Sequence, residues 1–268
     1  MCLEMKSNSK LVNIFKKFAT EILNKGNDHG YLEGTIGIVD SKVYMDGIYD
    51  EVNLCKKYFK KFGKVLDFGT GAGLHSWLLA NNYFEVCGID IDNFGDFDGN
   101  TRATLNMSRD QKLLWKKLMN KNNLKLSHYS GKIPFENNFF DGVIASAVIE
   151  HIPNKNRKFY LKEILRVLKP GGYLLVSRLP RRYSYTEALC RLFGLGHHQE
   201  LFTKNESIKM LNAQGFKIEK FWITDFFPSY PLSISNRIYP LFKAIEPWLL
   251  KLPFRYLSHD IRILAKKL

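Results

Sequence analysis

The sequence predicts an α/β protein built on a mostly parallel sheet with helices on both faces. Short apolar runs typical of buried strands alternate with longer segments whose apolar residues recur every three or four positions, as in helices. The segment Val65–Gly73, which reads V-L-D-F-G-T-G-A-G, joins the first central apolar run to a helical pattern. A strand, a glycine turn and a helix in this order favour a ligand-binding edge of a parallel sheet.

Length and composition narrow the classes of protein. A chain of 268 residues suits one α/β domain with insertions, or one domain with a small lobe. The formal net charge of +14 favours an anionic partner, either nucleic acid, phosphate-bearing lipid or acidic glycan, although a solvated lysine-rich surface gives the same excess. The four scattered cysteines, the lack of a secretory signal and the lack of a membrane-spanning apolar run predict a cytoplasmic protein with reduced thiols and no structural zinc.

The first part of the chain, residues 1–62, contains two amphipathic patterns. Apolar spacing predicts one helix over residues 9–24 and another over about 48–62. Between them, residues 26–47 are rich in glycine and aspartate, which predicts loop and turn. Part of this stretch, residues 28–47, is either a lid over a ligand or an ordinary surface loop.

The spacing of the glycines distinguishes three known kinds of ligand-binding turn. Gly69, Gly71 and Gly73 keep Cβ atoms away from a ligand that approaches the backbone. A phosphate-cradling loop would need Lys-Ser or Lys-Thr after the glycines, and a dinucleotide fingerprint would place its third glycine one residue later. The pattern present is D-x-G-x-G-x-G, which begins at Asp67.

Further strands follow at regular intervals. Phe84–Asp90 is a short apolar run ending in an acid, and such a carboxylate can accept both hydroxyls of a ribose. After a lysine-rich helical pattern within residues 93–123, the next strands are predicted at Leu124–Tyr129 and Asp141–Ser146. A helix over residues 154–168 ends at L-K-P-G-G, and strand Tyr173–Val176 follows.

Four of these motifs, within about residues 63–180, resemble class I S-adenosylmethionine (SAM) dependent methyltransferases, in particular the type 11 and ubiquinone-pathway enzymes. They are D-x-G-x-G-x-G, the acid after the second strand, the region I-P-F-E-N-N-F-F-D before the fourth strand, and L-K-P-G-G-Y-L before the fifth. The resemblance implies a Rossmann-like seven-stranded, mostly parallel sheet with a final antiparallel strand pair. It also implies SAM as cofactor and a SAM-binding core at residues 63–177.

Carried over motif by motif, the resemblance implies a set of cofactor-binding residues at the ends of the strands: Asp67, Gly69, Thr70, Gly71, Gly73, Asp90, Ile91, Ser130, Ser146 and Ala147. The family often has an acid after the third strand that bonds the adenine amino group. Here Tyr129-Ser130 stands in that place, so we expect stacking and hydroxyl or backbone groups to hold the adenine.

Glu150 and His151 follow the fourth strand and are the candidate catalytic pair. They resemble the E-H pair of ubiquinone-pathway O-methyltransferases, some of whose relatives bind a divalent metal through E-x-x-E-H. Ala147 replaces the first acid of that pattern, so no metal is expected. His151 is either a general base or a residue at a helix start with structural hydrogen bonds.

The last part, residues 178–268, completes the fold and carries two insertions, residues 178–202 and 224–259. The first offers candidate substrate-binding residues: Arg181, Tyr183, His197 and His198. A capping box from Thr203 to Glu206 opens a helix over residues 203–213, and Phe216–Ile223 and Asp260–Ala265 form the antiparallel pair.

The second insertion is rich in aromatic residues, with Pro240 and Pro247 expected to break it into short helices. Two interpretations of its apolar and basic residues stay open. We favour a substrate lobe that packs as core on the sheet. The other is a segment that contacts a lipid or lipid-linked substrate at an anionic membrane surface.

The sequence thus predicts methyl transfer from SAM to a hydroxyl or amine of a small-molecule, lipid-linked or glycan acceptor. The sequence Ser146-Ala147-Val148-Ile149 replaces the D/N-P-P-Y/F of exocyclic base methylation, so a nucleic acid acceptor is not expected. Two alternatives remain: an RNA methyltransferase that uses the basic surface, and a SAM-binding protein without turnover. The protein is expected in the cytoplasm, either free or at a membrane surface.

Overall fold

The computed structural model describes residues 2–24, 31–91, 122–129, 131–194 and 198–268. Within them, a seven-stranded sheet has the order β3-β2-β1-β4-β5-β7-β6. Only β7 runs antiparallel to its neighbours among these strands, which confirms the predicted Rossmann-like sheet. The strands are β1 Lys64–Phe68, β2 Glu85–Ile91, β3 Leu124–Tyr129, β4 Phe140–Ser146, β5 Leu168–Pro180, β6 Phe216–Thr224 and β7 Asp260–Lys267.

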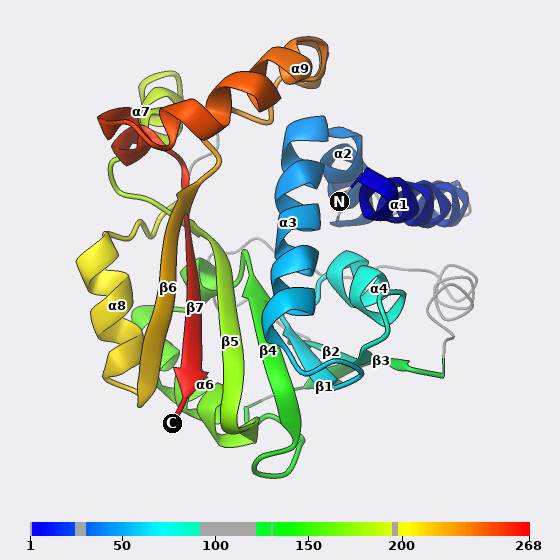
Figure 1. Cartoon of the computed structure of the whole chain (residues 1–268), viewed down its shortest axis with the longest axis vertical. Coiled ribbons are helices and arrows are strands. Elements are labelled where there is room, and N and C mark those ends of the chain that lie inside the picture. The colour runs from blue at the N-terminus through cyan, green and yellow to red at the C-terminus, as the bar shows by residue number, and fades with distance from the viewer. Residues whose placement is uncertain (1, 25–30, 92–121, 130, 195–197) are drawn as a thin grey trace.

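Helices cover both faces of this sheet (Figure 1). On one face lie α3 and α4, with α1 and α2 outside them, and on the other lie α6 and α8. The helices are α1 Cys2–Leu23, α2 Tyr31–Asp40, α3 Lys42–Tyr58, α4 Leu74–Ala80, α6 Asn154–Val167, α7 Tyr185–Leu192, α8 Lys204–Asn212 and α9 Leu232–Leu249, with 3-10 helices η3 Ile149–His151 and η4 Pro253–Leu257.

Two hydrophobic cores lie on the two sides of the sheet. Successive strand residues point to opposite faces, so Val65 joins the core with Ile48 of α3, whereas Leu66 joins the core with Ile164 of α6. Because β1 is buried on both faces after Lys64, its remaining residues are apolar except Asp67.

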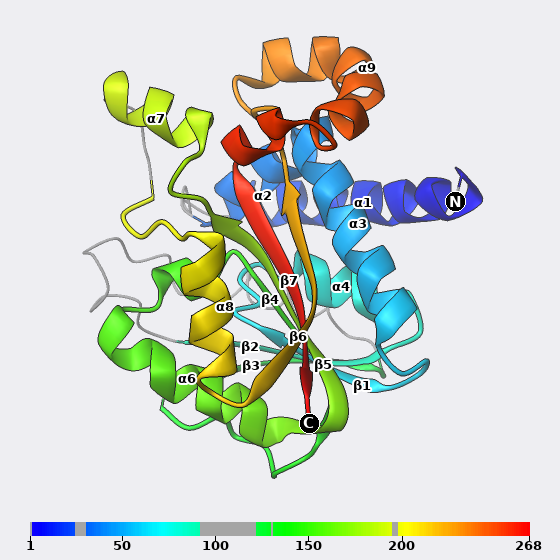
Figure 2. The ribbon, with the colours of Figure 1, turned by 60° about the vertical axis from the view of Figure 1, so that its left-hand side comes forward.

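The carboxyl ends of the parallel strands meet at one edge of the sheet, and α7, α9 and η4 lie above that edge (Figures 1 and 2). Strand β7 runs the opposite way, so its first residue is at the same edge, where Asp260 pairs with Pro180 of β5 and Thr224 of β6. In such sheets ligands bind outside the carboxyl ends of the strands. The described parts of both insertions therefore lie at the edge where such folds bind ligands.

The N-terminal segment differs from the prediction of a loop over residues 26–47. Residues 31–40 and 42–58 are helical, with Ser41 capping α3 by accepting from the Tyr44 N–H at 3.2 Å. Gly47 does not form a turn here but lets the Arg178 side chain pack closely against the helix, because a Cβ on Gly47 would lie 2.6 Å from a guanidinium nitrogen of Arg178. The glycine-rich composition was therefore misleading about secondary structure.

The insertion at residues 224–259 also differs from the prediction. Helix α9 continues through Pro240 and Pro247 instead of breaking at them. Ile234, Leu241, Ile245 and Trp248 are exposed and its other large apolar side chains are only partly buried, so they do not form the expected buried core. Contacts with the protein hold the helix in place, because Phe242 stacks on Phe227 with ring centroids 3.8 Å apart and Tyr239 donates to Asp46.

Several other elements agree with the sequence, whereas β5 runs over Leu168–Pro180 and extends beyond the predicted strand Tyr173–Val176 at both ends. In the capping box of α8, the Glu206 N–H donates to Thr203 Oγ1 at 3.2 Å and the Thr203 N–H donates to Glu206 Oε2 at 2.8 Å. Most of the lysine-rich helix predicted within residues 93–123 lies outside the described residues. Among the helices described, none has both the length and the hydropathy needed to cross a bilayer.

Candidate functional site

The glycine turn after β1 is held against the end of β2. The N–H groups of Gly69 and Thr70 both donate to the carbonyl of Ile89, at 2.9 and 3.0 Å. Gly69 has a φ of 76°, and a Cβ on it would lie 1.9 Å from Cγ2 of Val148. Gly71 and Gly73 also have positive φ values, of 52° and 78°. Only glycine adopts this sequence of conformations without strain, so the backbone shape depends on the motif.

Asp67 stabilises the turn through hydrogen bonds of its buried carboxylate. Its Oδ2 accepts from Thr70 Oγ1 at 2.9 Å and from Ser76 Oγ at 2.6 Å, and the residue is buried. The two hydroxyls are also 2.7 Å apart. The carboxylate of the motif is thus engaged with the loop and with the first turn of α4, which fixes the path of the glycines.

Asp90 brings the acid at the end of β2 next to the turn, because the Gly71 N–H donates to its Oδ2 at 2.6 Å. The backbone of Ile91 pairs with Tyr129 at the end of β3, and Ser130 lies outside the described residues. An open glycine backbone beside a carboxylate fits SAM, since the acid can accept the ribose hydroxyls while the glycines leave room for the rest of the molecule.

A buried charge network connects this region to α3. Glu51 is fully buried and its carboxylate meets Ser146 Oγ at 2.8 Å, His75 Nε2 at 2.7 Å and Arg178 Nε at 2.9 Å. Burial alone would raise the pKa of Glu51, but Arg178, followed by His75 and Arg262, holds that pKa well below its ordinary value. Ser146, predicted to bind cofactor, is therefore oriented by Glu51.

Glu51 was not among the residues predicted from the sequence, although one signal for it was present. Glu51 lies on the same face of α3 as Ile48, Val52 and Cys55, all of them buried. A carboxylate in the apolar face of a helix requires a partner, because burying an unpaired charge is costly. Its main partner, Arg178, also lies over the ring of Tyr44, 3.6 Å from the centroid.

A group of histidines and carboxylates gathers at the carboxyl edge. Glu187 Oε1 lies 2.7 Å from His198 Nδ1 and 3.0 Å from His259 Nε2. His151 is nearby, with its ring centroid 6.2 Å from that of His198. The structure thus brings together two predicted residues, His151 and His198, and two that were not predicted, Glu187 and His259.

Electrostatics in this group favour a positive charge at His259. Burial lowers the pKa of His259, but Asp260, with an oxygen 2.8 Å from Nδ1, and Glu187 outweigh burial and raise that pKa to about 10. The pKa of Glu187 is correspondingly held well below its ordinary value, because its hydrogen bonds to His198 and His259 exceed the effect of burial.

The other predicted site residues do not share the contacts between Glu187, His198 and His259. Arg181 is buried and donates to the carbonyls of Arg255 and Ser258, at 3.0 and 3.3 Å, so it fixes the chain between η4 and β7. Tyr183 has 64% of its surface exposed. Ala147 has a φ of 54° just after β4, and Glu150 is buried with Oε1 3.7 Å from His151 Nε2. His197 lies outside the described residues.

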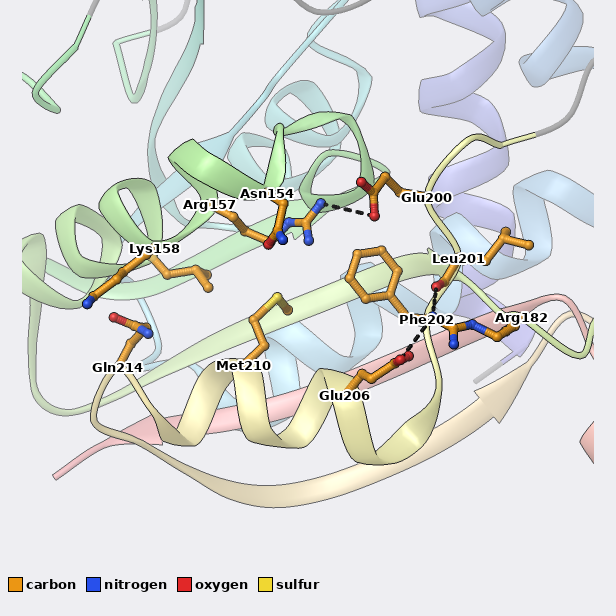
Figure 3. Close-up of a pocket in the computed structure, with 11 residues that line it drawn as sticks. Asn154, Arg157, Lys158, Arg182, Glu200, Leu201, Phe202, Glu206, Met210 and Gln214 are labelled. Atoms are coloured by element: carbon orange, nitrogen blue, oxygen red, sulfur yellow. Dashed lines mark hydrogen bonds and ion pairs between the residues drawn. The ribbon is translucent and has the colours of Figure 1, made fainter.

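A hollow between α6 and α8 is a different place in the molecule (Figure 3). Four of its charged lining residues form two ion pairs: Arg157 lies 3.8 Å from Glu200, and Arg182 lies 2.9 Å from Glu206. The residues of the glycine turn do not line this hollow. Most of its charge is thus paired within the protein, and the glycine turn remains the candidate cofactor site.

Comparisons with known proteins agree with this geometry. Residues 43–220 match a family described as a methyltransferase domain. The chain is 29% identical over 211 residues to an uncharacterized protein of Methanocaldococcus jannaschii, covering 76% of this chain and 80% of that one. It is 22% identical over 213 residues to the mitochondrial ubiquinone biosynthesis O-methyltransferase of Rattus norvegicus, covering 76% of this chain and 55% of the rat protein.

A solved structure shares the fold. A SAM-dependent methyltransferase of Methanosarcina mazei superimposes with a TM-score of 0.53 at 19% sequence identity, and the match covers 80% of this chain and 97% of that one. At this identity the likeness concerns the fold alone. It supports the Rossmann-like fold of this chain.

Proposed function

Because this chain belongs to the methyltransferase-domain family, we propose that it transfers a methyl group from SAM to a hydroxyl of an amphiphilic, lipid-type acceptor that it meets at an anionic membrane surface. The cofactor and the general activity follow from the family and the fold: this is a SAM-dependent methyltransferase. The acceptor is the proposal. The observation that carries it is the exposed apolar and basic surface of α9 and η4 above the carboxyl edge.

This α9–η4 surface, residues 232–257, combines large exposed apolar side chains with cations. Trp248 has 69% of its surface exposed and Lys251 Nζ lies 5.3 Å from its ring centroid. Tyr256 is 52% exposed, with the guanidinium of Arg255 5.0 Å from its ring centroid. Other exposed apolar residues of the surface are Ile234, Leu241, Ile245, Leu252, Phe254 and Leu257. Aromatic and basic side chains mixed in this way are typical of helices that lie in a membrane interface.

The position of the surface relative to the site supports the same acceptor class. Residue His259 follows η4 directly after Ser258, so this member of the histidine group is next to the α9–η4 surface in the chain. Both α7, which carries Glu187, and α9 lie above the carboxyl edge (Figure 1). The opposite side of α9 is held to α3, since Lys243 lies 2.8 Å from Asp46. An acceptor anchored in the membrane would therefore reach the carboxyl edge of the sheet without leaving the membrane.

A hydroxyl acceptor needs a group that removes its proton. In the reaction, the acceptor oxygen bonds to the methyl carbon, the bond from that carbon to the sulfonium sulfur breaks, and S-adenosylhomocysteine leaves. His151, with 24% of its side chain exposed, is the proposed base that takes the hydroxyl proton, and Glu150 would stabilise the resulting imidazolium. The rat relative, named as an O-methyltransferase, supports an oxygen acceptor.

The membrane part of the proposal is tested by cosedimentation with vesicles. We expect binding to vesicles that contain phosphatidylglycerol, and weaker binding as salt rises, because exposed charges are screened. The variant Trp248→Ala should bind about tenfold more weakly, since burial of one large apolar side chain contributes about 1.5–3 kcal/mol. Phe62→Ala is the matched control, because Phe62 is 64% exposed but precedes β1 at the opposite edge of the sheet. No binding at low salt would contradict the proposal.

The acceptor part is tested by transfer of a radiolabelled methyl group from SAM to cell extracts. We expect the label in the organic phase of a lipid extract, in a form stable to mild alkali, as an ether is and a methyl ester is not. His151→Asn should lose turnover by about 10²–10⁴-fold while SAM binding persists. Label in RNA would favour the RNA methyltransferase alternative. Cofactor binding without transfer to any extract would favour the non-catalytic alternative.

A further inference from the structure

Glu187, His198 and His259 form a compact group of potential metal ligands. Glu187 comes from α7, His198 from the chain before α8, and His259 from the residue before β7. One ligand atom from each, a carboxylate oxygen or a ring nitrogen, lies within 4.8 Å of the other two. In the described part of the chain, three separate segments thus converge on one point with the atoms that coordinate transition metals.

The surroundings of the group are those of a built site. Asp260 Oδ1 lies 2.8 Å from Nδ1 of His259, on the side of the ring away from Glu187. A carboxylate behind a coordinating imidazole fixes the ring and its tautomer, and this arrangement accompanies most metal-bound histidines. The second oxygen of Glu187 accepts from the backbone N–H of His198 at 3.2 Å, which orients that carboxylate as well.

Burial and charge also suit a cation. Glu187 and Asp260 are both buried, whereas the imidazoles of His198 and His259 keep 34% and 26% of their side-chain surface exposed. Both ring nitrogens of His259 face carboxylates. Two buried carboxylates there favour a positive charge between them, and a divalent cation bound at Nε2 of His259 would supply it in place of the proton.

We propose that Glu187, His198 and His259 bind one divalent transition metal ion of the zinc class. Two imidazoles and one carboxylate are ligands that zinc and its neighbours prefer, whereas magnesium and calcium prefer oxygen ligands. Three protein ligands leave a position for water or for an oxygen of another molecule. The site differs from the Glu150–His151 pair, where the sequence predicts no metal, and it does not depend on the proposed acceptor.

The test measures metal binding by the full chain in the absence of SAM and acceptor. After dialysis against a chelator, the protein is titrated with Zn²⁺ in competition with a chromophoric chelator, and Co²⁺ is added separately to record its visible absorption. We expect one equivalent of Zn²⁺, a Co²⁺ spectrum typical of a site with nitrogen and oxygen ligands, a higher melting temperature with Zn²⁺, and no such shift with Mg²⁺.

Variants locate the binding site. Glu187→Gln, His198→Asn and His259→Asn should each abolish stoichiometric binding, and Asp260→Asn should weaken it by about 10–100-fold through loss of the hydrogen bond to His259. His151→Asn is the control, because its imidazole is close to His198 but is not one of the three ligands. Circular dichroism confirms that each variant is folded.

Two results would overturn the proposal: wild-type protein that takes up no stoichiometric Zn²⁺, or binding that survives in folded Glu187→Gln and His259→Asn variants. The first result uses the unaltered chain, so it holds even where a variant fails to fold. Vesicle binding and methyl transfer are measured separately, so the failure of this site and the failure of the proposed acceptor are distinguishable.

Discussion

The glycine turn and the histidine group at the carboxyl edge are held together by contacts that span different lengths of sequence. Around the glycine turn, Asp67 bonds to Thr70 and Ser76, three and nine residues away, and Gly71 bonds to Asp90, 19 residues away. In the histidine group, Glu187 contacts His259, which is 72 residues away. Short-range contacts produce a sequence motif, whereas long-range contacts do not, so only the glycine turn formed a motif in the sequence.

Two acids near these regions differ in pKa. Glu51, near the glycine turn, is paired with Arg178 and has a lowered pKa. Glu246 of α9 accepts the Phe226 N–H at 2.7 Å, but burial and the charge of Asp225 raise its pKa to about 7. Cationic partners thus lower the pKa of a carboxylate, as at Glu51 and Glu187, whereas burial beside another acid raises it at Glu246.

The largest effect is expected from Glu51→Gln. This variant leaves the Arg178 guanidinium buried without its carboxylate, which should lower the free energy of unfolding by about 3–5 kcal/mol in a urea titration. Glu219→Gln is the control, because Glu219 pairs with Lys217 on the surface at 3.2 Å and such pairs contribute about 0–1 kcal/mol. Equal effects of the two variants would show that Glu51 contributes no more than a surface pair.

The pH dependence of the stability of Glu51→Gln tests the direction of the pKa shift of Glu51. The pKa of Glu51 is lower in the folded state than its ordinary value of 4.5, so its contribution to stability is present above pH 4.5 and is lost as the pH falls further. Wild-type protein should therefore lose more stability than Glu51→Gln on acidification below that pH. Parallel pH profiles would be evidence against the assigned ion pair.

Gly69→Ala is expected to have the next largest effect, a loss of about 2–4 kcal/mol, because it combines a left-handed φ with a steric clash. Gly194→Ala is the control, since Gly194 has a φ of 65° but no atom within 4 Å of its Cβ position. The difference between the two variants isolates the clash with Val148. Adding Val148→Ala to Gly69→Ala should restore part of the loss.

Asp90→Ala should weaken SAM binding by about 10–100-fold, since hydrogen bonds to a charged group contribute about 1.5–3 kcal/mol. Calorimetric titration with SAM and with S-adenosylhomocysteine measures this. Glu85→Ala serves as control, because Glu85 is an exposed acid at the opposite end of the same strand. If Asp90→Ala binds SAM with unchanged affinity, Asp90 does not bind the ribose.

The smallest effect is expected from Glu246→Gln. The pKa of Glu246 is raised from 4.5 to about 7, so wild-type protein should lose stability as the pH rises through this interval. The variant does not ionise and should be more stable than wild type above pH 7 by about 1 kcal/mol, a figure reduced by partial solvent exposure. A stabilisation that is already complete at pH 4 would mean that ionisation is not its cause.

Four elements show which features of the structure a local sequence pattern can predict. The strand Leu124–Tyr129 and the capping box at Thr203 were predicted correctly, because a buried strand and a helix start are determined by neighbouring residues. Helix α2 was missed, since its glycines suggested turns. The exposure of α9 was missed because apolar spacing alone does not tell whether a partner covers the helix.

By itself, the sequence determined the α/β class, the glycine turn, the acid at Asp90 and the resemblance to SAM-dependent methyltransferases, because each shows as a short motif or as a local apolar pattern. Only the tertiary structure decided that Glu51 orients Ser146 and that Glu187, His198 and His259 meet. These contacts arise where α3, α7 and the start of β7 pack around the carboxyl edge, and that packing joins residues whose separation in sequence gives no periodic signal.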